Sequence, residues 1–181
     1  RHNVGFQFLD FFCAEKRLSF KASKFDYHFT EGEFSGNPCV MIKPDTYVNN
    51  SGLAVLDCIN HYKADVENVL VVVDDINLNF ADVRIRKSGG DGGHNGLSSI
   101  IYHLQSKDFS RLRIGVGSDF KADNLADYVL SDFDKNDLIQ LEKSFALSIQ
   151  LVDSFILDGY HKMLSTFSRL KNLDKLNTEP E

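Results

Sequence analysis

A glycine-rich loop that ends in a histidine and an asparagine is the first feature of this sequence with chemical meaning. The loop spans residues 88–97, SGGDGGHNGL, and stands between an apolar run and a segment with helical spacing. Glycine permits positive φ angles and close approach of the backbone to a ligand. A polar loop of this kind, with His94 and Asn95 where a helix should begin, indicates a binding or catalytic site.

Other polar side chains that could join this loop stand at the ends of predicted elements. They are His2 near the chain start, Asn49 in a polar segment, and Asp74 with Asp75 after an apolar run. A histidine can act as a general base near neutral pH, and a carboxylate can fix its tautomer. Asparagine amides can hold a carbonyl group or a water. Because the nucleophile motif G-x-S-x-G is absent, the predicted chemistry is attack by an activated water.

Each of these polar residues, taken singly, also fits a structural role. Asn49 precedes an Asn-Ser-Gly turn, Asp74 or Asp75 could cap a turn, and His2 could be a solvated residue. The glycine loop with His94 is the one feature that favours function over structure by itself.

The elements that must position these residues follow from the apolar periodicity. Helices are predicted over 4–17, with Asn3 as N-cap, over 53–62, from 94 onward, and from 133 onward with an interruption at Gly159 before a last helix over 160–170. Strands are predicted over 39–42, 69–73, 83–86 and 112–116. Residues 25–34 are predicted to form a strand and hairpin around Gly32, and residues 46–51 a polar turn.

Alternation of strands and helices without a second composition regime predicts one α/β domain. We expect residues 1–171 to form this domain, with a mixed, mostly parallel twisted sheet flanked by helices in a three-layer sandwich. Residues 172–181 are expected to fray. A hydrophobic content of 43% is sufficient for a core.

No run of roughly 18 apolar residues and no leader segment is present, which predicts a soluble, cytoplasmic protein. Cys13, Cys39 and Cys58 lack metal-ligand spacing and are expected to be reduced, buried thiols.

Charge is unevenly distributed along the chain. The formal net charge is −6, but one stretch is basic and contains Arg84, Arg86, Lys87, Lys107, Arg111 and Arg113. A basic face could bind phosphates on an acidic protein. Alternatively, the alternating arginines are the solvated faces of two strands. The spacing alone leaves both interpretations open.

Several segments carry a family resemblance when they are taken in order. They are RHNVGF at 1–6, PDTYVNNSG at 44–52, VDDINL at 73–78, GGDGGHNGL at 89–97, FSRLRIGVG at 109–117 and YVLSDF at 128–133. In this order they resemble the bacterial peptidyl-tRNA hydrolases, and the resemblance covers nearly the whole chain.

The resemblance implies hydrolysis of the ester that joins a peptide to the terminal ribose of tRNA, without a cofactor. His2 would be the catalytic base and Asp74 the acid that orients it. We favour Asp74 over Asp75 because residues 76–78 then align with a Leu-Asp-Leu of the family.

The resemblance also implies how the substrate is held. Asn49 and Asn95 would hold substrate and water, with His94 and Tyr47 lining the cleft. The positions where the family places basic tRNA contacts are occupied by Arg84, Arg86 and Arg113. Peptidyl-tRNA is the expected partner, with no DNA and no membrane, and the chain is expected to be a monomer.

Some positions depart from the family pattern. The family opens with a strand and a Gly-Leu-Gly-Asn-Pro-Gly loop before the Arg-His-Asn motif, and this sequence opens at Arg1. That loop supplies an active-site asparagine in the family. Val48 stands for a methionine and Asn77 for an aspartate, which concerns packing more than chemistry.

Parts of the sequence also fit three other functions. A nucleotide-binding module would use the glycine loop for phosphate, but Gly90 and Gly92 do not continue into G-x-G-x-x-G, and no P-loop lysine follows. A non-hydrolytic RNA-binding relative remains the main alternative. A metal site with His94, His103 and an aspartate is the weakest, because nine residues along a helix place the two histidines on opposite faces.

Overall fold

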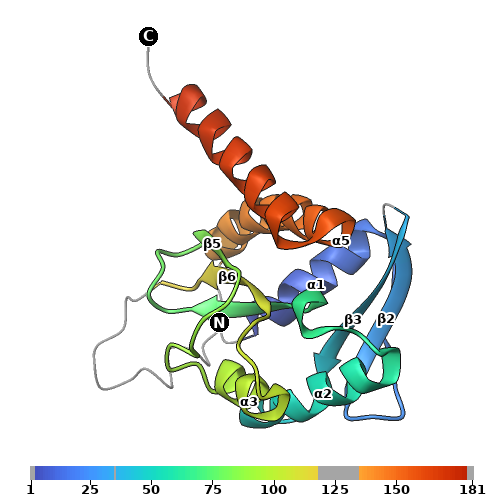
Figure 1. Ribbon diagram of the computed structural model, residues 1–181. Coiled ribbons are helices and arrows are strands. Elements are labelled where there is room, and N and C mark those ends of the chain that lie inside the picture. Colours follow the sequence, from blue (N-terminus) through green and yellow to red (C-terminus); the bar gives the residue numbers. More distant parts are fainter. Residues whose placement is uncertain (1–2, 35, 118–134, 179–181) are drawn as a thin grey trace.

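The described strands form two three-stranded sheets, and the sheet with β2 and β3 lies along one side of the protein (Figure 1). The computed structural model describes residues 3–34, 36–117 and 135–178. The first sheet has the order β1-β2-β3 and is antiparallel, with β1 at Lys21–Ala22, β2 at Tyr27–Phe34 and β3 at Asn37–Pro44. The second has the order β4-β6-β5, with β4 at Leu70–Asp75, β6 at Ser110–Gly115 and β5 at Val83–Arg86. In the second sheet β4 pairs parallel with β6, and β5 pairs antiparallel with it.

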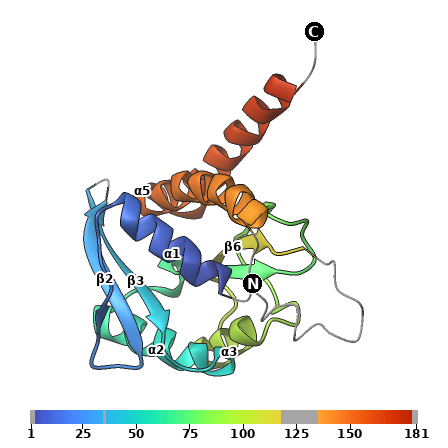
Figure 2. The same ribbon diagram turned by 180° about the vertical axis from the view of Figure 1, so that it is seen from behind.

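Helices cover the strands on two sides. The helices are α1 at Val4–Glu15, η1 at Val48–Asn50, α2 at Ser51–Tyr62, η2 at Val66–Asn68, α3 at Asn95–Leu104 and α5 at Lys135–Thr178. Figures 1 and 2 show α1 and α5 on one side of the strands and α2 with α3 on the other. The last part of α5 projects away from the body of the protein in both views.

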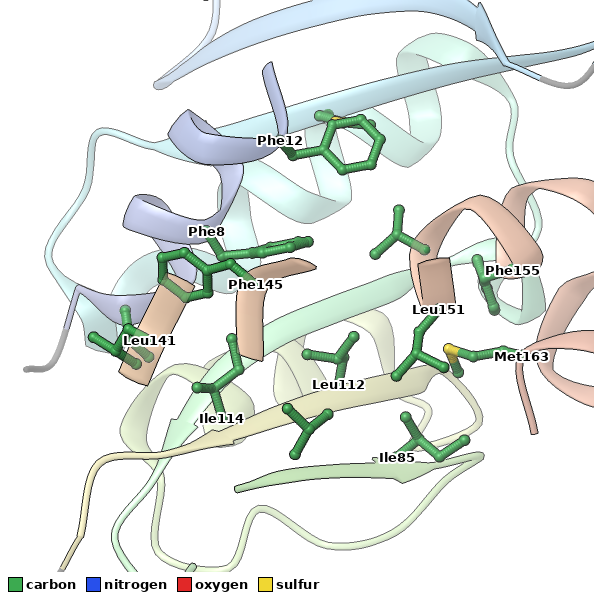
Figure 3. Packing of buried hydrophobic residues seen from close by; sticks show 14 of the residues in the cluster. Phe8, Phe12, Ile85, Leu112, Ile114, Leu141, Phe145, Leu151, Phe155 and Met163 are labelled. Carbon is green, nitrogen blue, oxygen red and sulfur yellow. The ribbon is translucent and has the colours of Figure 1, made fainter. Parts of the chain in front are cut away.

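The main hydrophobic core lies between the second sheet and the helices α1 and α5. Figure 3 shows Phe8 of α1 and Phe145 of α5 above Leu112 and Ile114 of β6. A smaller cluster lies on the opposite face, where Val73 of β4 packs with side chains of α2 and α3. Because successive side chains of a strand point to opposite faces, the arginines of β6 alternate with the core residues and face the α2 and α3 side.

The helix predictions are largely confirmed. α1 follows Asn3 at the N-cap position, although no side-chain capping hydrogen bond is made there. Asp158 and Gly159 have non-helical backbone angles and break α5 where the interruption was predicted. α5 continues through residues 172–178, so the division into a domain of 1–171 and a frayed tail stays a prediction.

The hairpin predicted at Gly32 is wrong. β2 runs without a break through Gly32 to Phe34, and the chain reverses afterwards, where Phe34 pairs with Asn37. A Cβ at Gly32 would lie 3.2 Å from the ring of Phe34, so this glycine makes room for packing along the strand rather than for a turn.

The sheet differs from the predicted one as well. Of the pairings among the described strands, only that of β4 with β6 is parallel, and these residues therefore do not form a mostly parallel sheet. Apolar periodicity identifies strands, but strand direction depends on long-range pairing, which periodicity does not contain. Within the described ranges, no helix has the length and apolar composition needed to cross a membrane.

Candidate active site

A large cavity of about 1500 Å³ opens between β3 and β4 and extends to the start of α3. Apolar side chains of these two strands, of α1 and of α5 line it. Its lining also includes polar residues, among them Asn3, Tyr47, Asp74 and His94, and we call the part where Asp74 near the end of β4 meets His94 at the start of α3 its polar end. Three residues singled out from the sequence, Tyr47, Asp74 and His94, therefore line one cavity.

Asp74 and His94 are in direct contact at this end of the cavity. His94 Nε2 lies 3.1 Å from Asp74 Oδ1, and the two side chains are 14% and 9% exposed. Asp74 stands near the end of β4, while His94 is the N-cap residue of α3. The strand end and the helix start thus meet through these two side chains.

The backbone of α3 determines the tautomer of His94. The ring Nδ1 accepts hydrogen bonds from the backbone amides of Gly96 at 3.1 Å and Leu97 at 3.2 Å. A nitrogen that accepts from two N–H groups carries no proton, so Nε2 holds the proton of the neutral ring and donates it to Asp74. Both ring nitrogens are thereby engaged, which fits a positioning role for His94 better than that of a general base.

Asp75 has a different environment from Asp74. Its Oδ2 pairs with Arg113 Nη1 at 3.1 Å, and its Oδ1 accepts from the backbone amide of Asn77 at 2.9 Å. Successive residues of β4 face opposite sides, and Asp75 shares the face of Val73, which is paired with Arg113. Asp75 is thus held by the sheet and its turn, and Asp74 is the acid at the cavity.

The glycine loop is held by internal hydrogen bonds and by Arg111. Asp91 Oδ1 accepts from the amide of Gly93 at 2.7 Å, and the carbonyls of Gly89 and Gly90 accept from the Arg111 guanidinium. Gly89, Gly92 and Gly93 have positive φ angles of 144°, 62° and 82°. The sequence predicted this use of glycine, but it gave no signal that Arg111 lies beneath the loop.

The two asparagines lie on adjacent segments. Asn49 is exposed in η1, and Asn95 is exposed at the start of α3. A Cβ at Gly96 would be 3.1 Å from Val48 Cγ2, so the chain neighbours of Asn49 and Asn95 are nearly in contact. Tyr47, which precedes η1, is 85% exposed.

The predicted tRNA contacts divide into two kinds. Arg84 and Arg86 are exposed on β5, which forms an edge of the second sheet. Arg113, which is opposite Arg84 in the register, is largely buried and pairs with Asp75. Of the three, Arg84 and Arg86 have the accessibility that a phosphate contact needs.

Two sequence predictions fall outside the described residues. His2 is one of them, and the segment at 128–133 is the other. Asn3, the residue after His2, is exposed and lines the same cavity as Asp74 and His94. The described chain therefore reaches this cavity one residue after the predicted base.

The alternative metal site has no support in the geometry. His103 Nδ1 lies 2.8 Å from the carbonyl of Ser99, one turn back in α3, whereas His94 faces Asp74. In the part of the chain that the structure describes, no group of three or more potential metal-ligating side chains occurs.

Comparisons with known proteins agree with this geometry. The family model described as peptidyl-tRNA hydrolase matches residues 1–175. The peptidyl-tRNA hydrolase of Finegoldia magna is 38% identical over 168 residues, which is 93% of this chain and 88% of that protein. That of Thermoanaerobacter pseudethanolicus is also 38% identical, over 93% of this chain and 90% of the relative.

A solved structure leads to the same family. The crystal structure of peptidyl-tRNA hydrolase from Acinetobacter baumannii superposes with a TM-score of 0.83 at 27% identity, over 92% of this chain and 85% of that one. The family match, the sequence relatives and the shared fold all place the chain with these enzymes. The chain belongs to the peptidyl-tRNA hydrolase family.

Proposed function

We propose that this chain hydrolyses the ester bond between a peptide and the terminal ribose of tRNA, using a water activated by His2. The observation that carries the proposal is the contact of the buried Asp74 carboxylate with His94 at the polar end of the cavity. Because both nitrogens of the His94 ring are engaged, the proton of the water must go to another group. His2 precedes Asn3, which lines the same cavity as Asp74 and His94.

In this mechanism His2 takes a proton from the water while the water oxygen attacks the ester carbonyl carbon. Asp74 orients His2 and stabilises its cation, while His94 holds Asp74 in place. Amides of Asn49 and Asn95 donate to the substrate oxygens and position the water. The carbon–oxygen bond to the ribose then breaks, and the proton returns to the ribose oxygen. The products are a tRNA with a free terminal hydroxyl and a peptide with a free carboxylic acid, which then loses its proton to the solvent.

The tRNA would be held outside the cleft by cationic side chains. Arg84 and Arg86 are exposed on neighbouring positions of one face of β5, where they can pair with phosphates. Arg113, largely buried in its pair with Asp75, would support this surface from within the sheet. Tyr47 lines the cavity and offers an exposed ring to the substrate. No cofactor takes part in this mechanism.

The setting of the enzyme follows from its substrate. Peptidyl-tRNA is a product of translation, so the proposed place of action is the cytoplasm, with the chain acting as a monomer that contacts neither DNA nor membrane. Residues 1–171 would form the catalytic domain, in which the strands make the middle layer between α1 with α5 and α2 with α3. The two hydrophobic clusters on opposite faces of the second sheet support such layers.

The proposal is tested by incubating the purified chain with a tRNA that carries an N-acetylated amino acid. Release of the N-acetylated amino acid and recovery of intact tRNA are measured over time, and tRNA binding is measured on the same sample. Enzymatic release supports the proposal. Binding of tRNA without release would overturn it and favour the non-hydrolytic RNA-binding alternative.

A further inference from the structure

The glycine loop rests on a buried cation of the neighbouring strand. Arg111 in β6 is 2% exposed. Its Nη1 donates to the carbonyl of Gly90 at 2.8 Å, and its Nη2 donates to the carbonyl of Gly89. The planar guanidinium thus binds two successive peptide groups of the loop at once.

The environment of Arg111 is unusual for a structural arginine. The guanidinium carbon lies 4.6 Å from the ring centre of Phe109, which is fully buried. Burial lowers the pKa of Arg111, and the nearby charge of Arg113 lowers it further, while Asp91 acts in the opposite direction. Burying a cation is costly without compensation, and here the loop carbonyls compensate the two terminal nitrogens, while Nε has no hydrogen-bond partner among the described residues.

The contact links the loop to the same pair of strands that carries Asp74. β6 pairs with β4 in parallel register, with Arg111 opposite Val71 and Ile114 opposite Asp74. Beyond Gly90 the loop is closed by Asp91, whose backbone carbonyl accepts from the His94 amide at 3.2 Å. One partner of the Asp74–His94 contact is therefore fixed by β4, and the other by a loop fixed on β6.

We propose that Arg111 is a positioning residue, which sets the glycine loop on β6 and thereby aligns His94 with Asp74. It does not touch the substrate. Its effect on catalysis rests on the proposed function, but its effect on the loop does not.

The variant that tests this proposal is Arg111→Met, which keeps apolar bulk over Phe109 and removes the donors. Arg169→Met, at an exposed position of α5, is the matched control. The first readout is the NMR spectrum of the free protein, in the backbone amides of residues 89–93 and the ring nitrogens of His94. The second readout is kcat and KM for the N-acetylated aminoacyl-tRNA.

We expect Arg111→Met to shift and broaden these amide signals and to change the ring nitrogen shifts of His94, while Arg169→Met leaves them unchanged. We expect kcat to fall about 100-fold, the loss that a displacement of about 1 Å causes, with KM affected less. Arg111→Lys keeps the charge but offers only one donor nitrogen. Its kcat and its loop signals should lie between those of the unsubstituted chain and those of Arg111→Met.

Unchanged loop amide and His94 signals in a folded Arg111→Met variant would overturn the proposal. If Arg111→Met does not fold, Arg111→Lys decides, because wild-type signals in that variant would overturn it equally. The NMR readout needs no substrate. Failure of hydrolysis in the wild-type chain would therefore count against the proposed function and leave the positioning of the loop to be decided by the spectra.

Discussion

The proton-bearing Nε2 of His94 lies 3.1 Å from Oδ1 of Asp74, and the other nitrogen of the ring is held by the first turn of α3. The imidazole therefore connects the backbone of a helix start to a carboxylate at a strand end. This arrangement holds Asp74 at the polar end of the cavity, which Asn3 also lines. It supports the proposed role of His94 as a positioning residue.

Asp74→Asn should reduce hydrolysis without unfolding the protein. The amide removes the negative charge that stabilises a protonated histidine, so we expect kcat to fall about 100-fold or more. The matched variant Asp75→Asn should instead lower the free energy of unfolding by about 3 kcal/mol, because it leaves Arg113 without its buried carboxylate. Steady-state kinetics and urea denaturation of both variants measure the difference. Equal loss of kcat in the two would contradict the separate roles of these acids.

The paired substitution Arg84→Ala and Arg86→Ala should weaken tRNA binding and leave kcat nearly unchanged. Each phosphate contact that is lost reduces the dependence of log K on log salt by about one, so the slope should fall by about two. Arg17→Ala with Arg169→Ala, also at exposed positions, is the control. Binding is measured across a series of salt concentrations. A slope that drops equally in the control pair would show that β5 is not the tRNA-binding surface.

Gly52→Ala should destabilise the packing of α2 on α3. A Cβ at Gly52 would lie 2.2 Å from the carbonyl oxygen of Ser99 and 2.6 Å from Nδ1 of His103. Overpacking of this kind costs about 1–3 kcal/mol, and thermal and urea unfolding should show the loss. Gly90→Ala, where a Cβ meets nothing within 4 Å, is the control. If Gly52→Ala has an unchanged free energy of unfolding, α2 and α3 can move apart at little energetic cost and the prediction is contradicted.

The thiols of the half-buried Cys39 and the buried Cys58 should make the protein less stable in alkaline solution. Burial raises the pKa of Cys39 and of Cys58 from 9.0 to about 11. Between these values the thiols ionise in the unfolded chain but stay protonated in the folded one, so ionisation favours unfolding. The free energy of unfolding therefore keeps its full value below pH 9 and decreases as the pH rises toward 11. Urea unfolding at several pH values checks this, with Cys39→Ala and Cys58→Ala expected to show a shallower decline.

Local sequence signals predicted much of the fold. β5 at Val83–Arg86 has the predicted bounds, α3 begins beside His94, and α5 breaks at Gly159. These features depend on nearby residues, through alternation, capping and glycine conformation. The misplaced hairpin at Gly32 and the pairing directions of the strands depend on partners distant in the sequence, which a local pattern does not specify.

The site was predictable where residue type dictates chemistry. Asp74, His94 and Tyr47 were singled out from the sequence and line one cavity. The role of Arg111 was not predictable, because an alternating basic strand suggests solvent or phosphate as its partner. The register places Arg111 opposite Arg86, yet Arg86 is exposed and Arg111 is covered by the glycine loop. Only the folded path of that loop distinguishes the two.

The most direct test of the account is the rate of peptidyl-tRNA hydrolysis by the His2→Ala variant at saturating substrate, with tRNA affinity and melting temperature measured on the same preparation. General base catalysis contributes about 10²–10⁴-fold. The account predicts a loss of kcat in that range, with tRNA affinity and melting temperature close to those of the unsubstituted chain. A His2→Ala variant that releases peptide at the full rate would contradict it.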